Sequence, residues 1–255
     1  MTVRELYQFL NERIPTSLSC EWDNDGLMCC PDGDRQVGRV LVALDITEEI
    51  VRAALEGIYD VVLSHHPLIF QPLRALNEND PVAKKVIRLL LGGVTAMSFH
   101  TRLDAVEGGV NDTLAAALGL SDVIPFGEGG ETIGRIGTLP EPEEIRDFAQ
   151  RVKSATHAPT VQVSDAGVKA HRVAVLGGGG SSDVEAARAA GADTYVTGEL
   201  KHNQLTDAPD RGMNLIAAGH FYTEDLICRR LAELVAEADA SVTVDILNSN
   251  PVRFI

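Results

Sequence analysis

The chain has 255 residues, of which 45% are hydrophobic and 23% are charged. This composition supplies one large or two modest hydrophobic cores and excludes a disordered or fibrous protein. The 22 lysines and arginines are outnumbered by 37 acidic residues, and the net charge of −15 disfavours bulk binding to nucleic acids or anionic membranes.

The beginning of the chain, MTVRELYQFLNERIP, lacks the apolar segment of a signal peptide. No stretch of the sequence reaches the roughly 18 apolar residues of a membrane span. We therefore expect a cytoplasmic protein. Its four cysteines include no zinc-type CxxC pair, so we expect reduced thiols.

The first predicted elements form a βαβ unit. RVLVALDI (39–46) predicts a buried strand, EEIVRAALEG (48–57) a helix that ends on glycine, and YDVVLSHH (59–66) the next strand. Short apolar runs that alternate with alanine-rich amphipathic segments are typical of parallel strands joined by crossover helices. The sequence therefore predicts an α/β fold.

Later segments repeat this pattern. RVAVLGGGG (172–180), SSDVEAARAAG (181–191) and ADTYVTGEL (192–200) follow the first unit at an offset of 133 positions. GVTAMSFHTRLD (93–104) matches MNLIAAGHFYTE (213–224) at an offset of 120, which lays His100 on His220 and Asp104 on Glu224. Two overlays in the same order predict two similar α/β halves related by internal duplication.

The expected halves are residues 1–125 and 126–255. Between them, FGEGGETIGRIGTLPEPEE (126–144) is rich in glycine, proline and glutamate, as a domain boundary would be. EPEEIRDFAQRVKSAT (141–156) predicts an amphipathic helix that resumes the fold.

SHHPLIF (64–70) places two histidines at the end of a predicted strand. Neighbouring side chains of a strand point to opposite faces, so His65 and His66 share one site only if the strand is ending or two metal centres are present. Pro67 supports the first condition because it withdraws a backbone donor. The alternative is that one histidine caps the strand and the other is exposed.

Two carboxylates change that balance. Asp104 follows His100 by four residues and Glu224 follows His220 by four, so each pair shares one face if its segment opens a helix. Imidazoles with carboxylates suit zinc, iron, manganese or similar divalent ions, and a bridging carboxylate permits two ions roughly 3.5 to 4 Å apart. Four further groups stand near the same predicted edge and could orient ligands or water: Thr101, Thr197, Glu199 and His202.

Other segments leave alternatives open. GGGGSSD (177–183) joins a strand to a helix and is either an anion-binding loop or a tight turn. DITEE (45–49) ends a strand with Asp45, which either caps a helix or faces the site. Trp22 is the only tryptophan, and we expect it to be a structural anchor.

The segments EWDNDGL, VALDIT, SHHPLIF, HTRLDAVEGGVND, VTGELKHN and AAGHFYTE together resemble the Nif-three-like family of dinuclear metal proteins, also named GTP cyclohydrolase I type 2 homologues. The resemblance covers nearly the whole chain. It implies five metal ligands: His65, His66, Asp104, His220 and Glu224. In this implied set Glu224 bridges two ions, and His100 is a neighbour and not a ligand. It also implies a homohexamer, a ring of trimers of dimers whose metal sites face an internal cavity.

The chain departs from the family in two respects. Arg102 stands where the family often has asparagine, which suggests an altered approach to the site or a group that binds an anion. The long middle insertion of some members is missing, so any function that rests on that insertion is absent.

The leading hypothesis is a metal-dependent hydrolase in which two divalent ions lower the pKa of a water molecule. For a GTP cyclohydrolase, water attacks the purine ring carbon, and Glu199, His202 or His100 moves protons. A phosphoester or another nucleotide fits the same centre. The rival hypothesis is a non-catalytic metal-binding protein whose hexameric ring serves as an interaction scaffold.

Overall fold

The computed structural model describes residues 1–127 and 132–255. These residues divide into two compact units, Met1–Val106 with Ile227–Pro251, and Glu107–Leu226 with Val252–Ile255. This division differs from the expected boundary at residue 125 because the chain enters its second unit earlier and later returns to the first. No helix within the described ranges has the length and apolar character to cross a membrane.

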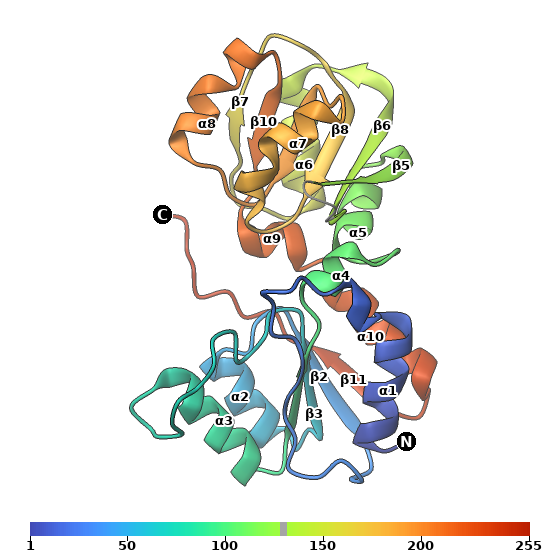
Figure 1. Ribbon diagram of the computed structural model, residues 1–255, viewed down its shortest axis with the longest axis vertical. Coiled ribbons are helices and arrows are strands. Elements are labelled where there is room, and N and C mark those ends of the chain that lie inside the picture. The colour runs from blue at the N-terminus through green and yellow to red at the C-terminus, as the bar shows by residue number, and fades with distance from the viewer. Residues whose placement is uncertain (128–131) are drawn as a thin grey trace. The chain divides into compact units, whose positions relative to one another are not determined.

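The first unit is a five-stranded sheet with helices on both faces (Figure 1). Its strands are β1 (Gly26–Cys29), β2 (Arg39–Ala43), β3 (Val61–Ser64), β4 (Thr95–Ser98) and β11 (Thr243–Ile246). Its helices are α1 (Val3–Arg13), η1 (Thr16–Leu18), α2 (Glu48–Glu56), α3 (Pro81–Leu91), α4 (Thr101–Ala105) and α10 (Ile227–Ala238). The strand order is β1-β4-β3-β2-β11, with only β1 antiparallel to its neighbour.

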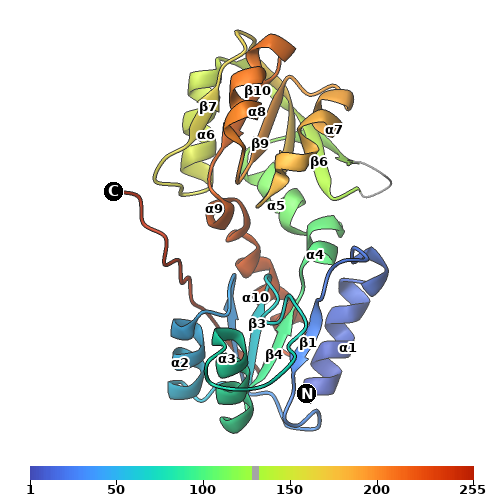
Figure 2. The ribbon, with the colours of Figure 1, turned by 60° about the vertical axis from the view of Figure 1, so that its left-hand side comes forward.

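Alternating side chains build two layers on this sheet. Val62 of β3 packs in one cluster with Ile50 of α2 and Leu89 of α3, whereas α1 and α10 lie on the other face (Figure 2). The predicted helix over 48–57 is confirmed: the Thr47 hydroxyl accepts a hydrogen bond from the Ile50 N–H, and the helix ends at Gly57.

The second unit is a six-stranded sheet, also covered on both faces (Figure 1). Its strands are β5 (Ser121–Phe126), β6 (Gly134–Glu143), β7 (Gln162–Ser164), β8 (Ala170–Leu176), β9 (Thr194–Thr197) and β10 (Asn214–Ala217). Its helices are α5 (Val110–Ala117), α6 (Ile145–Ala155), η2 (Gly180–Asp183), α7 (Val184–Ala189), α8 (His202–Asp207), η3 (Pro209–Arg211) and α9 (His220–Glu224). The order is β5-β6-β8-β9-β10-β7, with β8, β9 and β10 parallel.

Neighbouring residues of β8 again serve opposite faces. Val173 belongs to the cluster that contains α5 and α6, and Ala174 to the cluster that contains α7 and α8. The predicted α/β class is therefore confirmed in both sheets.

The expected boundary segment 126–144 is not a linker where it is described, although residues 128–131 lie outside the described part. Gly134–Glu143 forms β6, which pairs with β5 and β8 inside the second sheet. A Cβ at Gly134 would lie 2.3 Å from the Phe126 ring. Gly134 therefore permits close packing between β5 and β6. The glycine-rich composition of the segment resembled that of a turn in the sequence. The helix predicted over 141–156 is confirmed as α6 over Ile145–Ala155, whereas residues 141–143 belong to β6.

The two sheets repeat their backbone hydrogen bonds at an offset of 133. Val40 pairs with Val61 in the first unit, and Val173 pairs with Thr194 in the second. Asp60 accepts hydrogen bonds from two backbone N–H groups near the start of the neighbouring strand, and Asp193 does the same 133 positions later. These matches support the predicted duplication, which stays a prediction.

The second overlay is wrong by one residue. The Phe99 N–H donates to Ser64, and the equivalent bond runs from Ala218 to Thr197, so the third strands correspond at an offset of 119 and not 120. At this offset His220 takes the backbone place of Thr101, and Glu224 that of Ala105. The overlay at 120 aligns His100 with His220, which are not equivalent in the register of the sheet.

Candidate metal centre

The two histidines of SHHPLIF follow β3, which ends at Ser64. The Ser64 hydroxyl donates to the His66 carbonyl (2.7 Å), and the His66 N–H donates to the Leu44 carbonyl (3.0 Å). The backbone therefore leaves the strand before His65, and the two imidazole rings lie with centroids 4.8 Å apart. The strand therefore ends as expected, which meets the condition under which both histidines could serve one site.

Three histidine rings of the first unit are each held at Nδ1 by an oxygen acceptor. The acceptors are the Phe99 carbonyl for His65 (2.9 Å), Asp45 Oδ1 for His66 (2.8 Å) and Asp23 Oδ1 for His100 (2.8 Å). A carbonyl or carboxylate oxygen only accepts, so Nδ1 carries the proton and Nε2 carries the lone pair. This is the arrangement that orients metal-binding histidines.

The same three rings form one cluster. One ring nitrogen from each of His65, His66 and His100 lies within 4.8 Å of the other two. Asp104, on α4, places Oδ1 3.7 Å from His65 Nε2. The first unit thus brings together three predicted ligands and His100, which the family resemblance had left as a neighbour.

Asp45 faces this cluster and does not cap α2, whose cap is Thr47. Of the two alternatives for Asp45, helix cap or group that faces the site, the structure shows the second. The Asp45 carboxylate fixes the His66 ring from the end of the neighbouring strand.

Asp23 and Asp25, which sequence reasoning did not assign, hold the chain around His100. Besides His100, Asp23 accepts hydrogen bonds from the Thr101 N–H (3.0 Å) and hydroxyl (2.6 Å). Burial alone would raise the pKa of Asp23, yet the hydrogen bonds from His100 and Thr101 hold that pKa well below its usual value. Asp25 accepts from the His100 N–H (3.2 Å). The acidic pattern of EWDNDGL was the available clue.

Arg102 lies inside the first unit. It is fully buried, its Nε donates to Asp25 (2.9 Å), and its Nη1 donates to Asn11 (2.7 Å) and the Ile14 carbonyl (3.0 Å). Its guanidinium also lies 4.4 Å from the centre of the Phe99 ring. Arg102 therefore does bind an anionic group, the Asp25 carboxylate of its own unit, whereas its full burial does not support a role in the approach to the site.

In the second unit, His220 and Glu224 share one face of α9, as their spacing predicted. His220 Nε2 lies 3.2 Å from Glu224 Oε2, and His220 Nδ1 lies 3.3 Å from Glu199 Oε1. Glu199 is therefore a direct neighbour of the predicted ligand. His202 begins α8 and is exposed.

The glycine run that precedes η2 packs against α9. Gly178 has φ +63°, and a Cβ there would lie 2.1 Å from Glu224 Oε1. Its N–H donates to the Thr223 hydroxyl (3.0 Å). A Cβ at Gly198 would lie 2.7 Å from the His220 Cα. These glycines therefore admit the Glu224 carboxylate and the α9 backbone, which accounts for the run without a bound phosphate.

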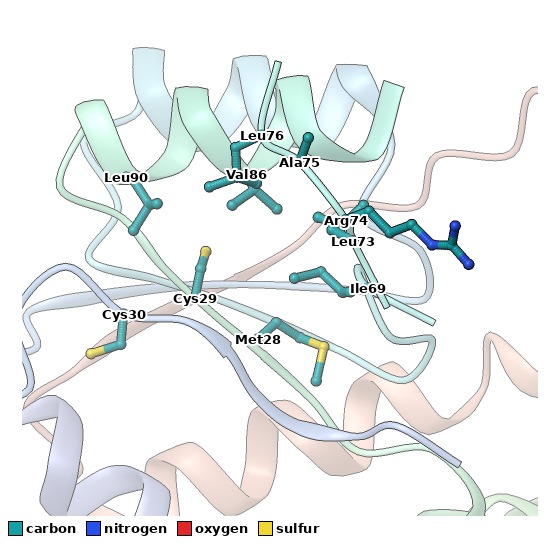
Figure 3. Close-up of a pocket in the computed structure, with 10 residues that line it drawn as sticks. All are labelled: Met28, Cys29, Cys30, Ile69, Leu73, Arg74, Ala75, Leu76, Val86 and Leu90. Carbon is teal, nitrogen blue, oxygen red and sulfur yellow. The ribbon is translucent and has the colours of Figure 1, made fainter. Parts of the chain in front are cut away.

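A separate apolar groove of about 590 Å³ lies in the first unit (Figure 3). Its ten lining residues include Met28, Cys29, Ile69, Leu73 and Val86, and none of the ten is a histidine or an acid. Burial raises the pKa of the Cys29 thiol to about 11, so it stays protonated. The groove lacks the ligand chemistry of the histidine cluster.

Fold and side chains together define an α/β protein with groups of imidazoles and carboxylates that could hold a metal ion. The model of the Duf34/NIF3 (NGG1p interacting factor 3) family matches residues 1–251, and the chain belongs to this family.

Relatives of the chain agree with this assignment. It is 32% identical to "GTP cyclohydrolase 1 type 2 homolog" of Streptococcus pneumoniae, over 100% of both chains. It is 32% identical to "Protein NIF3 homolog" of Schizosaccharomyces pombe, over 92% of this chain and 91% of that one. Among solved structures, TTHA1606 from Thermus thermophilus matches with a TM-score of 0.85 and 27% identity, over 100% of both chains.

Proposed function

We propose that this protein binds two divalent metal ions and hydrolyses a nucleotide. His65, His66 and Asp104 of the first unit would hold metal, as would His220 and Glu224 of the second. The observation that carries the proposal is the histidine cluster, in which three rings are fixed at Nδ1 by oxygen acceptors.

The residues present fit divalent ions. Imidazoles and carboxylates are the ligands that zinc, iron and manganese share, and the carboxylates of Asp104 and Glu224 would balance part of the metal charge. Gly178 leaves the space that the Glu224 carboxylate occupies beside His220. The family resemblance predicts that the ligands of both units share one dinuclear centre, with Glu224 as the bridge.

Bound ions would supply Lewis acidity that lowers the pKa of water to about 7. The chain itself would orient the substrate and move protons. Glu199 contacts His220 and is 63% exposed at its side chain, so it is placed to exchange protons with solvent or substrate. His100, held by Asp23, is the second candidate proton carrier, and His202 the third.

A nucleotide is the proposed substrate because relatives over the full chain carry the name GTP cyclohydrolase 1 type 2 homolog. For GTP, water would add to the purine ring carbon, while Glu199 or His100 accepts the proton. A nucleotide phosphoester would use the same groups.

A second candidate is a metal-binding interaction scaffold, built as the homohexamer that the family resemblance implies. It is favoured by the family description, which names an interacting factor. In this case the metals would stabilise the assembly and no substrate would be turned over.

The deciding experiment combines metal analysis with a substrate panel. Purified protein is loaded with zinc, iron or manganese, its metal content is measured, and it is incubated with GTP, other nucleotides and nucleotide phosphoesters. Turnover that disappears in Glu199→Gln while the metal content is retained supports the hydrolase. Two metals per chain without turnover favours the scaffold, whose hexamer would then appear by light scattering.

A further inference from the structure

Two large aromatic side chains stand exposed beside the histidine cluster. Trp22 is 58% exposed and Phe70 is 43% exposed. This exposure does not support the expectation that Trp22 is a structural anchor. An exposed indole next to polar, chemically active groups is typical of a recognition surface.

The two rings are arranged around His100. Trp22 and Phe70 meet edge to face, with ring centroids 6.2 Å apart. The His100 ring lies 6.2 Å from Trp22 and 6.1 Å from Phe70, again in edge contacts. The Trp22 and Phe70 ring planes are 71° apart, so a planar group that stacks on one ring meets the edge of the other and lies beside a member of the histidine cluster.

Both aromatic residues sit on segments that are fixed by polar contacts. Asp23, next to Trp22, binds His100 and Thr101. The Asn24 side chain donates to the Ile69 carbonyl, which ties the segment of Trp22 to the segment of Phe70. The platform is thus ordered before any ligand arrives, which lowers the entropic cost of binding.

We propose that Trp22 and Phe70 form a stacking platform for the planar base of a nucleotide. This inference rests on the proposed function, because it assigns the part of the substrate that the metal ligands do not recognise. Aromatic stacking tolerates any base, since every base has a π-face. The platform would therefore supply affinity for the base, and the identity of the base would be read by other groups.

Trp22 provides its own reporter because it is the only tryptophan in the chain. Zinc-loaded protein is titrated with GMP and with ribose 5-phosphate, which carries the same phosphate without a base, while tryptophan emission is recorded. We expect GMP to change the emission with a saturable curve, and ribose 5-phosphate to leave it unchanged. No saturable change with GMP, or equal changes with both compounds, overturns the platform.

Variants separate stacking from other effects. Phe70→Leu keeps the reporter and should weaken GMP binding by roughly 5- to 150-fold, the usual cost of removing a stacking ring. Phe254→Leu removes a ring that is 53% exposed in the second unit and should leave binding unchanged. Calorimetry on Trp22→Phe, which retains an aromatic ring, should show a smaller loss than Trp22→Ala. Equal GMP affinity in all four variants and the unchanged protein contradicts the proposal.

The outcomes also distinguish this proposal from the hydrolase. Turnover of GTP with an unchanged KM in Trp22→Ala would reject the platform and leave the hydrolase standing. Saturable GMP binding without turnover of any nucleotide would retain the platform and reject the hydrolase.

Discussion

The two units use the same hydrogen-bonded sheet frame but place their candidate ligands differently. In the first unit, His65 and His66 follow the second strand of the frame. At the matching positions of the second unit stand Gly198 and Glu199, and a Cβ at Gly198 would collide with His220. In the second unit, the strand end therefore carries a glycine in place of a histidine, and helix α9 packs closely against it.

Helices α4 and α9 differ in the opposite way, because at two matching positions the second unit carries the candidate ligands. His220 and Glu224 occupy backbone places that Thr101 and Ala105 hold in the first unit, and the Thr101 hydroxyl instead binds Asp23. One frame thus supports two sets of candidate ligands that come from different positions. Similar backbones do not require that equivalent residues carry the chemistry.

Removal of ligands from each unit tests whether the two sets hold the same metals. We expect His65→Ala with His66→Ala, and separately Glu224→Ala, to lower metal affinity by more than about 100-fold, since even supporting residues are worth about 10- to 100-fold. Metal content is measured by mass spectrometry after dialysis. His157→Ala, at an exposed position outside both sets, is the control.

If the sets share one dinuclear centre, either change lowers the content of both ions. Loss of one ion from the first variant and of one from the second would show two independent sites. Full metal content in either variant would contradict the assignment of its ligands.

The hydrogen bonds of Arg102 to Asp25, Asn11 and Ile14 lie within the first unit, so its removal should destabilise that unit. Arg102→Met leaves the Asp25 carboxylate without its buried ion pair, which costs about 3–5 kcal/mol in comparable cases. Urea denaturation measures the loss. At the matching position of the second unit, Phe221→Leu should cost less than about 1.5 kcal/mol. A loss of under about 1 kcal/mol in Arg102→Met would show that the buried pair does not stabilise the first unit.

Gly178 is a corresponding constraint in the second unit. Gly178→Ala places a Cβ against the Glu224 carboxylate at φ +63°, and the strained backbone alone costs roughly 1–2 kcal/mol. We also expect metal affinity to fall, because Glu224 must move. Gly179→Ala is the matched control, since nothing lies within 4 Å of its added Cβ. Equal melting temperatures and metal contents for the two variants would refute this role of the glycine run.

The strand and helix pattern of both units was predictable because apolar periodicity is a local property. The segments around β2, α2 and β3 were predicted with their boundaries displaced by a few residues. The place of 227–251 was not predictable, because the return of α10 and β11 to the first sheet depends on long-range pairing with β2. The β6 segment was misread because glycines needed for cross-strand packing resemble those of a linker.

Ligand candidates were predictable where spacing or a strand end positions them, as for His65 and His66 or for His220 and Glu224. The groups that hold them were harder to find. Asp23 and Asp25 lie more than 70 residues before the groups they bind, and such contacts leave no periodic pattern. The burial of Arg102 and the exposure of Trp22 were not predictable, because burial of a charge and exposure of an indole are decided by tertiary packing.

Substitutions at Asp60 and Asp193 test the hydrogen-bonded sheet frame that the two units share. We expect their effect on the free energy of unfolding to be the smallest. Burial would raise the pKa of Asp60, but hydrogen bonds from Gly38, Arg39 and Arg35 lower it below its ordinary value of 3.8. A carboxyl whose folded pKa is lowered stabilises the fold above its unfolded pKa, and that contribution disappears as the pH falls through the folded pKa. Asp60→Asn should therefore cost about 1 kcal/mol near pH 7.

As the pH falls from 7 through the lowered folded pKa of Asp60, the difference in free energy of unfolding between Asp60→Asn and the unchanged protein should shrink and then disappear, because the carboxyl becomes protonated. Urea denaturation across this pH range measures the difference, and Asp193→Asn is the matched variant in the second unit, where the same backbone bonds recur. A difference that persists unchanged as the carboxyl becomes protonated would show that the charge of Asp60 is not what anchors the strand pair. Comparable losses in both variants at pH 7 would extend the repeat from hydrogen-bond geometry to energetics, while the candidate ligands attached to it remain different.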